Sequence, residues 1–135
     1  MPLPYTGGCQ CGSVRYVLTT EPMRLAVCHC KECQRQSGSA FGMSMLVKKD
    51  SLTVSGVMKQ FTRIADSGNE VTGAFCPECG VRIYHGLKSV PDMLSLKPGT
   101  LDDTSWLRPR YFIWLKSAQN WISVPDGVET FEKQN

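Results

Sequence analysis

Short segments rich in β-branched and aromatic residues dominate the pattern of apolar and polar positions along this chain. Residues 13–19 and 58–63 partly alternate between apolar and polar side chains, as expected of strands with one buried face. Residues 25–27 and 40–47 are apolar runs typical of more deeply buried strands. Further strand-like segments lie at residues 52–54, 70–75, 81–84, 93–96, 111–115 and 121–124. The pattern therefore predicts a mainly β protein.

Helical signals are few and short. Residues 32–36 and 101–105 are the candidates, and no segment carries an apolar stripe over three helical turns. Proline and glycine mark turns at Pro98-Gly99 and at residues 125–127. Because no repeat, linker or low-complexity tract interrupts the pattern, we expect residues 1–135 to form a single domain.

The seven cysteines fall into three tight groups, and none is left over as an ordinary core residue. An odd number of cysteines does not fit a closed disulfide framework, whereas Cys-x-Cys and Cys-x-x-Cys spacings suit chelation of a metal. Thiolates are soft ligands that select zinc or iron–sulfur centres. The sequence therefore predicts metal binding, with zinc as the preferred ion. The three groups are Cys9 and Cys11; Cys28, Cys30 and Cys33; and Cys76 and Cys79.

Two pairings of these groups can close a tetrahedral four-sulfur site. In the first, Cys9 and Cys11 join Cys76 and Cys79, which leaves the middle group as a three-sulfur site. In the second, Cys30 and Cys33 join Cys76 and Cys79, which leaves three separate cysteines without a common role. We prefer the first pairing because it accounts for every sulfur.

The first pairing separates a structural site from a reactive one. A four-sulfur zinc site is saturated and supports folding, whereas a three-ligand site keeps an open position for water or substrate. Three thiolates leave Zn²⁺ with a net negative charge, so that it polarises carbonyl groups weakly. A small thiol, held as a thiolate nucleophile, therefore suits the open position at Cys28, Cys30 and Cys33 better than hydroxide does.

Composition and charge agree with a site for small molecules. The formal net charge of +3 is too small to indicate nucleic-acid binding, and seven thiolates with two Zn²⁺ would bring it to zero. The first residues show no signal-peptide pattern, and no apolar run approaches the roughly 20 residues that span a bilayer. We therefore expect a cytoplasmic protein with reduced thiols and no membrane partner.

Three motifs in this order resemble the glutathione-dependent formaldehyde-activating enzyme family, which includes centromere protein V-like domains. They are G-G-C-x-C-G-x-V-R-Y at residues 7–16, C-H-C-x-x-C-x-R-x-S-G-S-A-F at residues 28–41 and F-C-x-x-C-G at residues 75–80. The similarity extends to residues 116–121 and so covers nearly the whole chain. One departure is Phe112, which stands before Ile113 where family members often carry a histidine.

The resemblance implies an Mss4-like fold of small antiparallel sheets around zinc. It implies one structural zinc held by Cys9, Cys11, Cys76 and Cys79. It also implies a second, more labile zinc at an active site made by Cys28, Cys30 and Cys33. The activity it implies is addition of glutathione to formaldehyde, giving S-(hydroxymethyl)glutathione, by a carbon–sulfur lyase. A non-catalytic zinc module for protein interaction or metal buffering is the alternative interpretation.

Several other side chains could serve this chemistry. Lys31, Arg35 and Arg63 could pair with the carboxylates of an anionic thiol, although a solvated surface is the simpler interpretation. His29 lies between two predicted ligands, and we expect its side chain to point away from the metal. His85 is expected to be structural or exposed. Residues 37–39 could face the open metal position.

Overall fold

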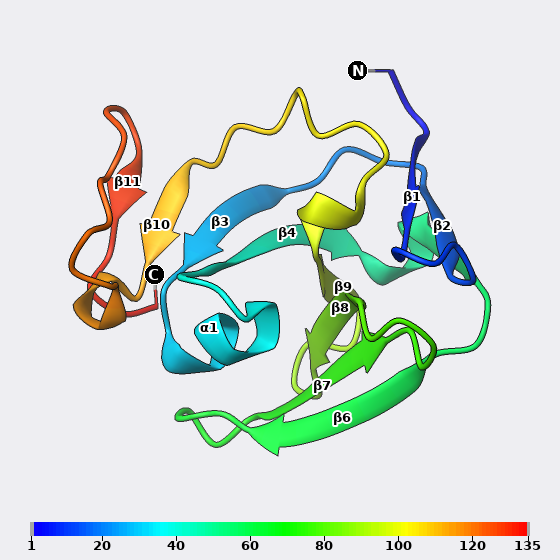
Figure 1. The fold of residues 1–135 in the computed structure, drawn as a ribbon, viewed down its shortest axis with the longest axis horizontal. Coiled ribbons are helices and arrows are strands. Elements are labelled where there is room, and N and C mark those ends of the chain that lie inside the picture. Colours follow the sequence, from blue (N-terminus) through cyan, green and yellow to red (C-terminus); the bar gives the residue numbers. More distant parts are fainter. Residues whose placement is uncertain (1, 135) are drawn as a thin grey trace.

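The computed structural model describes residues 2–134, which form two β-sheets and one short α-helix (Figure 1). The smaller sheet has the antiparallel order β1-β2-β5. Its strands are β1 (Tyr5–Gly8), β2 (Arg15–Leu18) and β5 (Leu52–Ser55). Along β2 the side chains alternate, so that Tyr16 and Leu18 are buried while their neighbours are exposed.

The larger sheet has eight strands in the order β11-β10-β3-β4-β9-β8-β7-β6. All of its pairings are antiparallel except those of β10, which runs parallel to both β3 and β11. Its strands are β3 (Arg24–Cys28), β4 (Gly42–Lys48), β6 (Lys59–Ile64), β7 (Glu70–Phe75), β8 (Arg82–Leu87), β9 (Met93–Leu96), β10 (Tyr111–Ile113) and β11 (Glu129–Thr130).

The two faces of the larger sheet have different partners. Met45 and Val47 of β4 point to the face that packs against the smaller sheet, where they join the main apolar core. Gly42 and Ser44 alternate to the opposite face, which carries the helix α1 (Lys31–Ser37). Figure 1 shows α1 below β3 and β4, with β6 and β7 on its other side. The molecule therefore has an apolar layer on one side of the sheet and a helix layer on the other.

The mainly β fold predicted from the sequence is confirmed, and nine of its strands coincide with expected segments. The helix expected at residues 32–36 is also present, as α1. Short 3₁₀ turns lie at Lys49–Ser51, Pro98–Thr100 and Leu115–Ser117. Strands β1 and β11 were not predicted, because glycine dominates the first and the second has two residues.

Two predicted elements are wrong. The expected strand at residues 121–124 is irregular, and Trp121 is 69% exposed instead of packing in a core. The expected helix at residues 101–105 is absent, because Leu101 forms an isolated bridge to Gly7. Asp103 then accepts hydrogen bonds from the backbone N–H and the hydroxyl of Ser105, which stabilises a turn in place of a helix. Within residues 2–134, no helix is long and apolar enough to cross a membrane.

Candidate metal centres and the cavity between them

The two satellite cysteine groups meet where the two sheets approach each other. Cys9 and Cys11 follow β1, and Cys76 and Cys79 lie between β7 and β8. Their four sulfur atoms all lie within 4.8 Å of one another, with Cys11 Sγ 3.6 Å from Cys9 Sγ and 3.7 Å from Cys76 Sγ. Sulfurs at the corners of a tetrahedral zinc site are about 3.8 Å apart, because each Zn–S bond is about 2.3 Å long. The donor atoms and their spacing fit such an ion.

Hydrogen bonds surround this four-cysteine cluster. The Val14 N–H donates to Cys9 Sγ at 3.2 Å, and Ser13 Oγ lies 3.1 Å from Cys11 Sγ and 3.2 Å from Cys76 Sγ. Burial raises the pKa of Cys9, but the Val14 N–H and the neighbouring thiol and hydroxyl groups outweigh it and lower the pKa to about 5. Thiolate charge at this cluster is therefore stabilised by the surrounding chain.

The middle group forms a second, more local cluster. Cys28 ends β3, Cys30 caps the N-terminus of α1 and Cys33 lies within the helix, facing the sheet. Their three sulfur atoms also lie within 4.8 Å of one another. Hydrogen bonds from Cys28 and Cys33 lower the pKa of Cys30. The hydrogen bonds with Cys30 and Cys33, together with burial, raise the pKa of Cys28. For Cys33 the hydrogen bond with Cys28 lowers the pKa, but Cys30 and burial outweigh it and raise the pKa. This three-cysteine cluster offers three corners of a tetrahedron.

Local contacts fix α1 and hence the three-cysteine cluster. The Cys33 N–H donates to Cys30 Sγ at 3.3 Å, and Gly38 ends the helix in the left-handed conformation with φ 62°. The Gln34 side-chain amide donates to the carbonyls of His29 at 2.8 Å and Ser117 at 3.0 Å. Gln34 thus ties the helix both to the strand before it and to the C-terminal segment.

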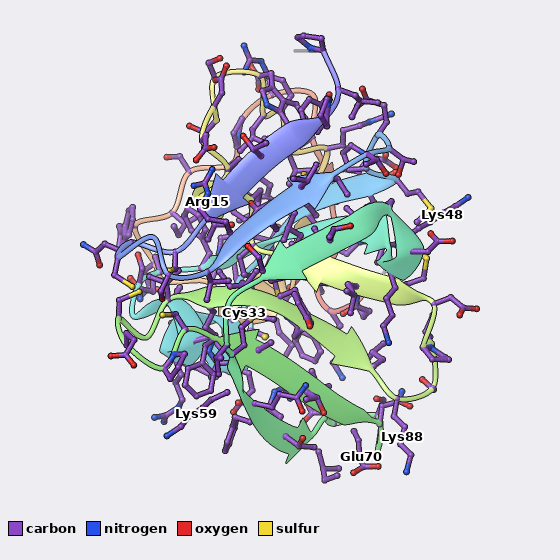
Figure 2. All side chains as sticks on the ribbon, turned by 90° about the vertical axis from the view of Figure 1, so that its right-hand side faces the viewer. Arg15, Cys33, Lys48, Lys59, Glu70 and Lys88 are labelled. Atoms are coloured by element: carbon purple, nitrogen blue, oxygen red, sulfur yellow. The ribbon has the colours of Figure 1, made fainter. Side chains whose placement is uncertain are left out.

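A cavity of about 440 Å³ lies between the two clusters. One member of each cluster, Cys33 and Cys79, lines it, together with the positively charged side chains of Arg82 and Lys97. Figure 2 places Cys33 inside the molecule, far from the exposed Glu70–Lys88 ion pair at the end of the sheet. Burial lowers the pKa of Lys97 and the nearby Cys33 opposes that shift. The cavity is therefore a positively charged space that the three-cysteine cluster borders through Cys33.

Polar atoms without partners surround the same cluster. His29 is fully buried against Phe41 and Phe112, with ring centroids 5.6 and 5.5 Å away, and within residues 2–134 neither of its nitrogens has a hydrogen-bond partner. Gln36 Oε1 and His85 Nδ1 are likewise buried and unpartnered among the residues that the structure describes. Buried polar groups usually find partners, so this side of the sheet carries unused hydrogen-bonding capacity.

The structure places the other candidates differently. Lys31 and Arg35 line a separate open hollow beside Trp121, outside the cavity, and Arg63 Nε lies 3.6 Å from Glu32 Oε2. Ser37 lines the cavity, but its hydroxyl donates to the Phe41 carbonyl at 2.8 Å.

Two further expectations concern the histidines. His29 was expected to point away from the metal, and it is buried in an aromatic environment. His85, expected to be structural or exposed, is partly buried, and the pKa of its side chain is lowered to about 3 by burial and by Lys97, Arg63 and Arg82.

Sequence reasoning missed Arg82 and Lys97. The only local signal is the alternation of β9 and its extension, in which Ser95 and Lys97 share a face opposite Leu94 and Leu96. That alternation does not reveal which face of the sheet meets the cysteines, since this depends on strand pairing.

Comparison with known proteins now defines the class of this mainly β protein with two cysteine clusters. The family model described as glutathione-dependent formaldehyde-activating enzyme matches residues 4–117. The chain belongs to this family.

Two curated relatives carry the same description as a provisional name. One, from Talaromyces marneffei, is 24% identical over 130 residues, which cover 90% of this chain and 67% of that protein. The other, from Sordaria macrospora, is 27% identical over 88 residues, or 61% of this chain and 37% of that protein. The chain thus spans about two thirds of the first relative and just over a third of the second.

A crystal structure of a Rhodobacter sphaeroides protein shares the fold. It aligns with a TM-score of 0.58 at 20% identity and covers 78% of this chain and 92% of that one.

Proposed function

We propose that this chain adds a small thiol, such as glutathione, reversibly to an aldehyde, such as formaldehyde, at the three-cysteine cluster. In this reaction the thiol loses its proton, its sulfur bonds to the carbonyl carbon and the carbonyl oxygen takes up a proton. The reverse direction cleaves a carbon–sulfur bond, which is lyase chemistry. The thiol and aldehyde named in the family description support this pair of substrates.

One observation supports the proposal: three sulfurs are grouped as metal ligands beside a cavity and are one ligand short of a tetrahedral set, whereas the four sulfurs on the other side of that cavity form a complete set. Cys9, Cys11, Cys76 and Cys79 would hold a structural Zn²⁺, and Cys28, Cys30 and Cys33 a second, more labile one. At the second site zinc would supply a fourth position where a thiol is held deprotonated. All seven cysteines are free, which suits a cytoplasmic compartment that keeps thiols reduced.

The chain's own residues would prepare the site for that thiol. The backbone N–H of Cys33 donates to Cys30 and helps to disperse thiolate charge. Lys97 and Arg82 make the cavity positive, which attracts an anionic thiol. Phe41 and Met43 line the same cavity and offer apolar surface that limits water around the reacting sulfur.

Cys30→Ser tests the proposal. We expect the variant to lose about one zinc per chain and to condense ¹³C-formaldehyde with glutathione at least ~100-fold more slowly, as followed by NMR. Its far-UV circular dichroism should match the wild type, because the four-cysteine cluster is untouched.

Lys31→Ser is the matched control, since Lys31 lies next to Cys30 but lines the other hollow. Full activity of Cys30→Ser would rule out the mechanism. Wild-type protein that binds a single zinc and turns over no thiol–aldehyde pair would instead support the non-catalytic module.

A further inference from the structure

The cavity beside the three-cysteine cluster carries a pair of cations, and the proposed reaction does not say which group of an anionic thiol they contact. Strand register shows how they reach it. Arg82 pairs with Phe75 and His85 with Gly73. The register shifts at a β-bulge between Ala74 and Phe75, so Arg82 and His85 share one face of β8 although they are three residues apart. Ser95 pairs with both His85 and Leu46, and Lys97 follows two residues later on that same face. Lys97 and Arg82 therefore project on the side of the sheet that carries α1.

Neither cation is satisfied within the protein. Among residues 2–134, the side chains of Lys97 and Arg82 have no ion pair and donate no hydrogen bond, and no aspartate or glutamate lines the cavity. By contrast, Arg15 is paired with Asp102, and Lys88 with Glu70, at the surface. Two unpaired cations in a partly buried cavity repel each other, and an anion between them would relieve that cost.

The thiolates of the cluster offset only part of this charge. Cys33 lines the cavity together with Lys97 and favours its charged form, and a bound Zn²⁺ would withdraw that negative charge. Arg82 extends towards β7, and its guanidinium lies 2.6 Å from where a side chain at Gly73 would begin. Glycine at position 73 thus leaves the space that Arg82 occupies.

We propose that Lys97 and Arg82 bind a carboxylate of the thiol substrate, so that the enzyme selects thiols that carry a carboxylate over neutral ones. This inference rests on the proposed function. The planar guanidinium of Arg82 can hold a carboxylate through two parallel hydrogen bonds, while Lys97 adds a second positive charge in the same cavity.

Gln36 extends the same subsite. Gln36 lines the cavity together with Cys33, and its Oε1 atom is buried and lacks a hydrogen-bond partner among the described residues. It can accept a hydrogen bond from an N–H group of the ligand. A carboxylate and an N–H group on one thiol describe an amino-acid or peptide thiol, and glutathione is such a molecule.

Binding of S-methylglutathione tests this subsite without any turnover, because the methylated sulfur cannot react. Calorimetric titration of the zinc-loaded protein should show binding that weakens about 10-fold or more in Lys97→Gln and in Arg82→Gln, as expected when a charged hydrogen bond is lost. Lys97→Arg should retain most of the affinity. Lys31→Gln, which removes a cation from the other hollow, should leave it unchanged.

A second measurement compares thiols. Glutathione should have a KM at least ~10-fold lower than its diethyl ester in the wild type, and Lys97→Gln should remove that difference while changing kcat little. Unchanged S-methylglutathione affinity in both variants, or no binding by the wild type, would overturn the subsite. The subsite would also be refuted if Lys97→Gln lost zinc but kept its affinity for S-methylglutathione, because Lys97 would then stabilise the metal site and not bind the ligand. Lys97-dependent binding without any condensation would support the subsite and refute the proposed reaction.

Discussion

The two cysteine clusters use the same ligand chemistry but are built in opposite ways. The four-cysteine cluster joins segments 65 residues apart, such as Cys11 and Cys76, and ties the hairpin of the smaller sheet to the larger one. The three-cysteine cluster draws on six consecutive positions, Cys28 to Cys33, at a single strand–helix junction. A metal that closes a long loop removes much conformational freedom from the unfolded chain, whereas one that closes a short turn removes little.

The surroundings of the two clusters also differ. Cys76 is fully buried in the main apolar core, and a serine hydroxyl and a backbone N–H contact the sulfurs of its cluster. Both clusters border the cavity through one cysteine each, but the three-cysteine cluster also adjoins buried polar atoms that lack partners among the described residues. We infer that the four-cysteine cluster stabilises the fold, and that the three-cysteine cluster contributes less stability but remains accessible to a ligand.

Cys76→Ser should give the largest effect. The hydroxyl is a poor zinc ligand in an apolar core, and structural zinc sites in small domains contribute about 10–16 kcal/mol to folding, as much as a domain's whole stability. We expect the variant to bind less zinc at both sites and to lose its cooperative thermal transition. Circular dichroism and metal analysis measure both.

Ser13→Ala is the control for that substitution. It removes a hydroxyl that lies 3.2 Å from Cys76 Sγ but keeps all four sulfurs, so the protein should remain folded with its full zinc content. A Cys76→Ser protein that melts cooperatively near the wild-type temperature would refute the structural role of this cluster.

Gly42→Ala probes the other cluster with a minimal change. A methyl group at this position would lie 3.1 Å from Cys33 Cβ, so α1 must shift by a few tenths of an ångström. We expect zinc to leave the three-cysteine site at least ~10-fold more readily in a chelator titration, with thermal stability lowered only slightly. Gly99→Ala, where a side chain meets nothing within 4 Å, is the matched control at the cavity rim. Equal zinc retention by the two variants would show that the position of α1 does not control this site.

Gly80→Ala applies a comparable change at the four-cysteine cluster. Gly80 follows Cys79 with φ 80°, a left-handed conformation that costs an alanine about 1–2 kcal/mol. No atom would obstruct the methyl group, so this strain is the whole effect. Urea denaturation should show that loss of stability with both zincs retained. Selective loss of the second zinc, with stability unchanged, would reverse the roles that we assign to the two clusters.

The sequence predicts the clusters better than it predicts the cavity, for a physical reason. Cysteine spacing within each group is a local property, so the count of seven and the odd middle group suggested a complete set and an incomplete one. The cations at positions 82 and 97 come from β8 and the end of β9, and only the pairing of β4, β9 and β8 brings them to α1. Such long-range register leaves no local trace in the chain.

Errors in the predicted elements have the same origin. The apolar run at residues 121–124 suits a strand, but no strand of the described chain pairs with it, and Trp121 remains exposed. Conversely, β11 has only two residues and exists because β10 offers it an edge. Tertiary pairing overrides local propensity at both places.

His85→Gln should give the smallest effect, visible only as a dependence on pH. In the folded protein the pKa of His85 is lowered to about 3, by burial and then by the charges of Lys97, Arg63 and Arg82, against an ordinary value near 6.5. The unfolded chain therefore binds more protons in this range, and the wild type loses stability as the pH falls from about 6.5 towards 3. Between pH 6.5 and 5.5 that loss is about 1 kcal/mol, and the glutamine variant should lack it.

Urea denaturation of both proteins at the two pH values, at equal free zinc, measures this difference. The metal contribution cancels as long as both proteins hold the same zinc content. His29 is the chain's second histidine, and burial also lowers its pKa, so His29→Leu reports the only other histidine contribution of the same sign. Parallel pH profiles for the wild type and His85→Gln would show that the pKa of His85 is not lowered in the folded protein. A flatter profile in His85→Gln would show that the burial of His85, aided by the neighbouring cations, makes this side of the sheet less stable in acid.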